Sequence, residues 1–244
     1  MKSKINNEFY NDLNDEWYHS NNHAIAILRA EQKVKNQWVK DQIQSLLPDT
    51  QSILDIACGG GFLANELSKY YSDVHGVDAS KTSLETAKNF DLTKKVQYQY
   101  ADAYNLPFEN ETFDVVCLMD FLEHVERPEE IILEASRVLK PKGLMFYHTF
   151  NRNFLSRLII IKAVEAFVPN TPKNLHVYEL FLKPEEVWNF LRNAGLKPTL
   201  STGIKPKFDR AFFKSIMTRR LDERFDFELI PSHKLAYLGV AKKC

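Results

Sequence analysis

The sequence predicts an α/β fold built on a parallel β-sheet, and three observations support this prediction. Between residues 52 and 150, short apolar runs alternate with longer amphipathic stretches, the order expected for strands joined by crossover helices. One run, at 114–119, reads DVVCLM and is apolar on both faces, as a central parallel strand should be. Another stretch, at 53–67, reads ILDIACGGGFLANEL, which indicates a strand, a glycine turn and a helix.

A helical segment is expected before this core, at residues 1–48. Apolar and aromatic residues recur there at helical spacing, first at Phe9, Leu13 and Trp17 and later at Trp38. A proline at the end of the segment marks the change of pattern.

The core elements are expected in strict alternation between residues 50 and 150. The apolar runs predict five strands and the amphipathic stretches predict three helices between them. The strands are expected at 52–57, 74–77, 96–101, 113–119 and 144–150, and the helices at 61–71, 81–89 and 128–139.

The alternation is less regular after residue 150. An apolar helix is expected at 154–168 and a second helix at 184–193, with Pro184 near its start and Gly195 just past its end. Two last strands are expected at 196–202 and 234–241. Between them lies a charged, Phe-rich insertion, 205–229, to which the pattern assigns no structure.

The 244 residues are expected to form a single domain, because no linker divides them. Its parts are the N-terminal helical segment, the ligand-binding core, a lid region and the C-terminal part of the sheet, at 1–48, 50–150, 151–183 and 184–244. Thirty-two basic residues balance 32 acidic ones, so the charge gives no reason to expect a nucleic-acid partner. The three cysteines lack metal or disulfide spacing, and no secretory signal or membrane span is evident, which favours a cytoplasmic location.

Acidic residues lie at the carboxyl ends of three of the predicted strands, which is the sheet edge where open α/β sheets bind ligands. Asp55 precedes the glycine turn and disfavours a pyrophosphate, because like charges would crowd one site, but it suits a ligand with an ammonium group. Asp78 can accept both ribose hydroxyls of a nucleoside, and Asp102 can accept the exocyclic amine of adenine. This combination indicates S-adenosylmethionine rather than a dinucleotide.

These residues resemble the motif of class I S-adenosylmethionine-dependent methyltransferases, E/D-x-G-x-G-x-G, with alanine in place of its first glycine. The resemblance implies a Rossmann-like sheet of seven strands, the last one antiparallel, with helices on both faces. It implies S-adenosyl-L-homocysteine as the product of the cofactor. The residues expected to bind the cofactor are Arg29, Asp55, Ala57, Gly59, Gly61, Asp78, Ala79, Asp102, Ala103 and Met119.

Three further segments resemble the ubiquinone-biosynthesis O-methyltransferases: 118–132, 149–153 and 172–187. The third follows a P-K-x-x-H-x(4)-F-x-K/R-P-x-E pattern, matched by Pro172, Lys173, His176, Phe181, Lys183, Pro184 and Glu186. The insertion at 205–229 has no counterpart in that pattern. The resemblance implies a phenolic or catechol-type acceptor, such as a polyprenyl phenol or a demethylated quinol. Two alternatives stay open: a methyltransferase for another small molecule, and a non-catalytic partner that binds the cofactor within a biosynthetic assembly.

Glu123 and His124 are the candidate catalytic residues, because they follow the fourth strand at the ligand edge. A phenol has a pKa near 10, so His124 is expected to act as a general base and Glu123 to orient or deprotonate the acceptor. The resemblance adds an alternative, since an E-x-x-E-H motif in some relatives binds a divalent metal such as Mg²⁺, and Asp120 with Glu123 and His124 gives D-x-x-E-H here. His148 is expected to line the cleft, and His176 is a candidate for contact with substrate.

The apolar helix at 154–168 has three interpretations. It can pack on the sheet or in a dimer, or it can form a lid that also touches a membrane surface, where a polyprenyl substrate resides. Fifteen residues are too short to span a bilayer. The sequence therefore leaves peripheral membrane contact and the oligomeric state open.

Overall fold

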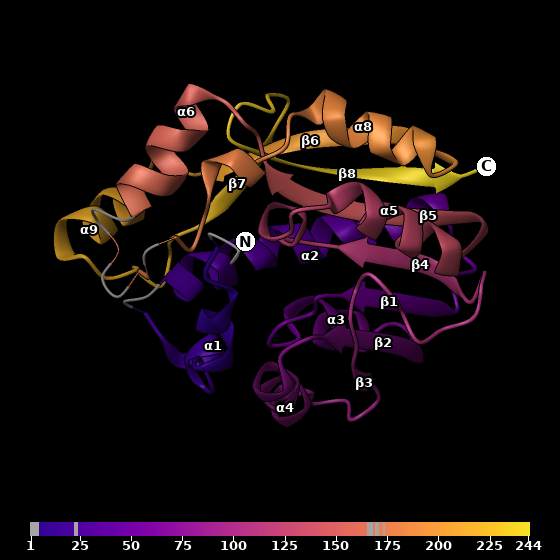
Figure 1. The fold of residues 1–244 in the computed structure, drawn as a ribbon. Helices are drawn as coiled ribbons and strands as arrows, with labels where there is room; N and C mark the ends of the chain where they lie inside the picture. Colours follow the sequence, from indigo (N-terminus) through magenta and orange to yellow (C-terminus); the bar gives the residue numbers. More distant parts are fainter. Residues whose placement is uncertain (1–4, 22–23, 165–167, 169–170, 173) are drawn as a thin grey trace.

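The computed structural model describes residues 5–21, 24–164, 168, 171–172 and 174–244, and its centre is one eight-stranded sheet (Figure 1). The strand order is β3-β2-β1-β4-β5-β8-β6-β7. The strands are β1 (Ser52–Ile56), β2 (Asp73–Asp78), β3 (Gln97–Tyr100), β4 (Phe113–Leu118), β5 (Leu139–Phe150), β6 (Leu196–Pro206), β7 (Phe227–Ile230) and β8 (Ala236–Lys243).

The first five strands pair in parallel, as the alternation of strands and helices predicts. β8 is the last strand of the chain and runs antiparallel to both β5 and β6, which confirms the antiparallel last strand. The prediction of seven strands was wrong by one, because the insertion contributes β7, an edge strand antiparallel to β6. β6 is also longer than expected, and its extension Gly203–Pro206 is the part that pairs with β7.

Helices cover both faces of the sheet (Figure 1). Pro128 and Pro184 occupy the first turns of α5 and α8, where a proline costs no hydrogen bond, and the Ser80 hydroxyl caps α4 by accepting from the N–H of Ser83. The main helices are α1 (Glu16–His19), α2 (Ala24–Leu46), α3 (Phe62–Leu67), α4 (Lys81–Phe90), α5 (Pro128–Val138), α8 (Pro184–Asn193) and α9 (Arg210–Thr218). Short 3-10 turns are η1 (Asn7–Asn11), η2 (Leu122–His124) and η4 (Tyr178–Leu180).

The apolar segment after β5 differs from the single α-helix that its pattern predicts. It begins as α6 (Phe154–Ser156), capped by Asn153, and continues as the π-helix η3 (Arg157–Ala163). Residues 165–167 of the predicted helix, and Lys173 of the matched motif, lie outside the described residues.

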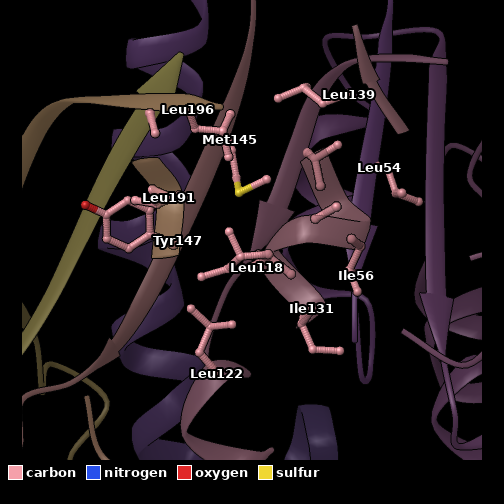
Figure 2. Close-up of a cluster of buried hydrophobic side chains, with 14 of the residues drawn as sticks. Leu54, Ile56, Leu118, Leu122, Ile131, Leu139, Met145, Tyr147, Leu191 and Leu196 are labelled. Atoms are coloured by element: carbon pink, nitrogen blue, oxygen red, sulfur yellow. The ribbon is translucent and has the colours of Figure 1, made fainter. Parts of the chain in front are cut away.

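Two hydrophobic clusters form the core, one on each face of the sheet. In one, α5 and α8 pack over buried strand residues such as Leu118 and Met145 (Figure 2). In the other, α2 and α3 cover the opposite face through residues such as Val39 and Leu63. A fully buried leucine at such a position contributes about 2–5 kcal/mol relative to alanine. The core therefore fixes the sheet edge at which the strands end.

Candidate active site

A cavity of about 670 Å³ lies at the carboxyl ends of β1, β2 and β4. The N-terminal segment, η3 and α9 contribute the rest of its wall. It brings together most of the residues expected from the sequence: Asp55, Ala57, Gly59, Asp78, Ala79, Asp102, Ala103, Met119, Glu123 and His124. The sheet edge predicted to bind ligand is thus the edge that is hollowed.

The turn after β1 has a backbone that only certain residues adopt easily. Gly59 and Gly61 have φ values of +52° and +81°, in the left-handed region, and Ala57 is also left-handed at +56°. The Gly59 N–H donates to Oδ2 of Asp78 at 2.8 Å, which joins the turn to the end of β2. Gly61 is not among the lining residues; it caps the start of α3.

Of the two carboxyl groups at this end of the cavity, Asp55 is buried and Asp78 is half-buried. Burial raises the pKa of Asp55 to about 8, and burial also raises the pKa of Asp78 although backbone N–H groups of Ser80 and Gly59 oppose it. In the part of the chain that the structure describes, no basic side chain pairs with either carboxyl. Buried acids without a cation fit a ligand that brings an ammonium group and adjacent hydroxyls, as S-adenosylmethionine does.

The N-terminal segment covers the glycine turn, a contact that sequence analysis did not predict. A Cβ on Gly59 would lie 2.7 Å from the Trp17 ring, and the Tyr18 hydroxyl donates to the carbonyl of Gly60 at 2.8 Å. Arg29 is not among the lining residues: its guanidinium donates to the carbonyls of Trp17 and Ser20 and so holds this segment in place. The contact expected between Arg29 and the cofactor stays a prediction.

Glu123 is fully buried in the site and, within the described chain, only one of its two carboxyl oxygens accepts a hydrogen bond. Oε2 accepts from the Thr149 hydroxyl at 2.8 Å, whereas Oε1 is buried without a hydrogen-bond partner among the described residues. Burial raises the pKa of Glu123 to about 7, and the charge of Asp120 also raises it while His148 opposes the shift. A carboxyl with a pKa near the working pH is suited to general-base catalysis.

His124 lies beside Glu123 and stays uncharged. Burial lowers the pKa of His124 to about 4, and burial with the neighbouring imidazole of His124 lowers the pKa of His176 to about 3. The two rings are 5.5 Å apart, and the Tyr10 hydroxyl is 3.5 Å from Nε2 of His124. His176 lines the cavity, as a residue in contact with substrate would. Neutral imidazoles here can donate or accept a hydrogen bond to an acceptor ring.

The carboxylate of Asp120 is already bound by other side chains and is not free to bind a metal ion. Oδ1 lies 2.6 Å from Nζ of Lys35 and 2.7 Å from Nδ1 of His148; Oδ2 lies 2.7 Å from the same Nζ and accepts from Gln32 at 2.8 Å. Lys35 and Gln32 thus donate three hydrogen bonds to a carboxylate that has about four lone-pair sites, and the His148 ring packs against Oδ1, which leaves little room for a metal ion. His148 is fully buried behind Asp120 and does not line the cavity, contrary to expectation.

The residues therefore do not fit the alternative of a metal site at the D-x-x-E-H sequence. Among the described residues, the acidic and imidazole atoms that converge are those of Glu31, Asp120 and His148, not those of Glu123 and His124. The ammonium of Lys35 already lies among them, 3.3 Å from Glu31. No step of the reaction is assigned to a metal.

The far part of the cavity is apolar. Ile159, Ile160 and Val164 line it from the segment after β5, and Phe212 and Ile216 line it from α9. The segment after β5 and α9 together form this part of the wall, and the sequence had assigned no structure to the part of the chain that contains α9. In the described chain, no helix combines the length and the apolar character needed to cross a bilayer.

Fold and site together define an S-adenosylmethionine-dependent methyltransferase of class I. The family model for the Methyltransferase domain matches residues 54–147. The fold is shared with the crystal structure of magnesium protoporphyrin IX methyltransferase from Synechocystis PCC 6803 with bound S-adenosylhomocysteine. That comparison has a TM-score of 0.66 and 15% identity, and it covers 97% of each chain.

Sequence relatives identify the family more closely. The ubiquinone biosynthesis O-methyltransferase of Hydrogenovibrio crunogenus is 32% identical over 226 residues, covering 91% of this chain and 90% of that protein. The protein of the same name from Coxiella burnetii is 31% identical over 197 residues, covering 80% and 82%. This chain belongs to the ubiquinone biosynthesis O-methyltransferase family.

Proposed function

We propose that this enzyme methylates a phenolic hydroxyl of a polyprenyl phenol or demethylated quinol. The observation that carries the proposal is the continuity of the cavity. It runs from the cofactor end at Asp55 and Asp78, past the buried carboxyl of Glu123, into an apolar part lined by η3 and α9. A ring with a hydroxyl and an apolar tail matches that sequence of surfaces, and the relatives are named for O-methylation in ubiquinone biosynthesis.

Glu123 is the general base in this proposal. S-adenosylmethionine, when bound, supplies a methyl group from its sulfonium, and S-adenosylhomocysteine remains. The phenolic proton passes to Glu123, while the phenolic oxygen forms the new bond to carbon as the carbon–sulfur bond breaks. The Thr149 hydroxyl holds Oε2 and leaves Oε1 for the proton. Neutral His124 positions the ring, since its low pKa leaves it a weak base.

The enzyme is proposed to reach its substrate by peripheral contact with a membrane surface. Phe154 and Leu158 on the α6–η3 segment and Phe213 and Met217 on α9 are exposed, although other residues of both segments line the cavity. The two segments lie at the same end of the molecule (Figure 1). Such a surface suits an anionic bilayer, because it also carries exposed basic residues. These are Arg157, Lys162, Arg210, Arg219 and Arg220.

The deciding experiment is methyl transfer to a short-tailed demethylated ubiquinol, followed by mass spectrometry. We expect a product heavier by one methylene group and a much lower kcat/KM for the same ring without a tail. Equal turnover of the tail-less ring would favour a soluble small-molecule acceptor. No product on any phenol, with cofactor binding shown by calorimetry, would favour the non-catalytic partner.

A further inference from the structure

A buried lysine pairs with Asp120, the first residue of the D-x-x-E-H sequence. Lys35 comes from the middle of α2, is fully excluded from solvent and lies within 2.7 Å of both carboxylate oxygens of Asp120. Glu31, one helical turn earlier, is 3.3 Å from the same ammonium. Gln32 and His148 complete the surroundings of Asp120.

The cluster stands directly behind the wall of the active site. Asp120, Glu31 and Gln32 line the cavity, whereas Lys35 and His148 do not. Asp120 holds a left-handed backbone conformation, φ +56°, at the end of β4, three residues before Glu123. A buried charge pair fixes such a residue, because separating the pair leaves an uncompensated charge in a low-dielectric interior.

Lys35 keeps its charge in this setting. Burial by itself lowers the pKa of Lys35, but the negative charges of Asp120 and Glu31 outweigh burial and raise it overall. The ammonium carries three donors, and three carboxylate oxygens lie within 3.3 Å of it. An additional cation among the same oxygens would meet direct repulsion.

From this geometry we propose that Lys35 is a built-in replacement for the divalent metal, so that methyl transfer in this protein is metal-independent. Lys35 acts as a positioning residue: it holds Asp120 in place, and through it the turn that carries Glu123 and His124. The inference rests on the proposed O-methyltransferase function, but its first test does not require turnover.

Calorimetric titration of the wild-type protein with Mg²⁺, Mn²⁺ and Zn²⁺ tests the occupancy of the cluster. We expect no stoichiometric binding and no change in the unfolding temperature or in activity when EDTA is added. One divalent ion per chain, with activity that EDTA removes and the metal restores, would overturn the proposal. Because binding is measured directly, a protein that methylates no phenol would refute the proposed function and still decide the metal question.

Variants of Lys35 test its role. Lys35→Ala removes the ammonium, leaving Glu31, Asp120 and His148 with ligand atoms within 4.8 Å of one another, so we expect it to gain Zn²⁺ or Mn²⁺ binding. If it binds neither ion, the cluster is not a cation position and the proposal fails. Lys35→Met keeps the length but not the charge, and we expect kcat to fall about 10²-fold with cofactor affinity unchanged.

The exposed Lys33 on the same helix provides the matched control as Lys33→Met. A kcat, KM and pH profile of Lys35→Met equal to those of this control would contradict the positioning role. If Lys35→Met does not fold, the double variant Lys35→Met/Asp120→Asn removes both charges. We expect it to fold, to bind the cofactor and to keep the low kcat, whereas wild-type turnover from it would overturn the role.

Discussion

Replacing Glu123 with glutamine tests the general base directly and removes one buried ionisable group without changing its size. The glutamine carbonyl can still accept from Thr149, so the hydrogen bond that positions the side chain survives. A positioned general base contributes about 10²–10⁴-fold, so we expect kcat to fall by that factor. Because the pKa of Glu123 is raised to about 7, we expect wild-type activity to rise with pH in that range, and we expect the variant to lack this rise.

The same substitution lowers activity but is expected to raise the stability of the folded protein at high pH. Moving the pKa of Glu123 from 4.5 to about 7 makes its ionisation about 3 kcal/mol less favourable in the folded chain than in the unfolded one. Between pH 4.5 and 7 the folded state therefore holds a proton that the unfolded state has lost, and stability falls as the pH rises. The free energy of unfolding of Glu123→Gln minus that of wild type should therefore be larger above pH 7 than at pH 4. The increase should reach up to about 3 kcal/mol.

Urea unfolding of both proteins at pH 4 and pH 8 measures this difference, and pH profiles of kcat/KM measure the catalytic part. Glu126→Gln is the matched control, since Glu126 is an exposed carboxyl on the same loop. A Glu123→Gln enzyme that keeps the rise near pH 7 would show that another group titrates there. A pH-independent stability difference would show that Glu123 is not protonated at neutral pH in the folded protein.

Three further predictions concern the cofactor end and the outer surface. Because burial raises the pKa of Asp55 to about 8, binding of the cofactor's ammonium should release a proton below that pH. The release should appear as a buffer-dependent enthalpy in calorimetry, and it should be lost in Asp55→Asn. Gly59→Ala should weaken cofactor binding and lower the unfolding temperature, because φ is +52° and the new Cβ would meet the Trp17 ring at 2.7 Å; unchanged values would show that the turn relaxes freely. Leu158→Asp should reduce flotation with anionic liposomes at least tenfold, whereas the equally drastic Leu92→Asp at an exposed site near α4 should not; equal flotation of both would contradict the proposed membrane surface.

The cofactor half of the site could be predicted because its signals are local. Each acid lies at or just past the carboxyl end of its own strand, and parallel strands end at one edge, so Asp55, Asp78 and Asp102 had to lie together once the strands were recognised. The edge strand β7 could not be predicted in the same way. Its four residues become a strand only by pairing with the extension of β6, and no short pattern records that pairing.

The acceptor half depends on contacts between distant parts of the chain. Lys35 and Asp120 are 85 residues apart, so the motif around Asp120 gave no indication that a buried ammonium pairs with its carboxylate. A signal was nevertheless present in the sequence of α2. Glu31 and Lys35 fall between Leu28 and Trp38 at helical spacing, which places two charged residues on the face that should be buried. Charged residues on such a face need a partner, and Asp120 is that partner.

One electrostatic rule separates the roles of the buried acids around this cavity. Asp55 and Asp78 lack a paired cation in the described chain, so burial raises the pKa of each, and a ligand that carries a positive charge relieves the cost. Asp120 has Lys35, so its pKa is lowered and it gains nothing from a further cation. Glu123 has neither a cation of its own nor full exposure to water, which leaves its pKa near neutrality, where a proton can be taken up and released. The chain thus binds its cofactor with unpaired acids, fixes its geometry with a paired acid, and has one acid whose proton can move.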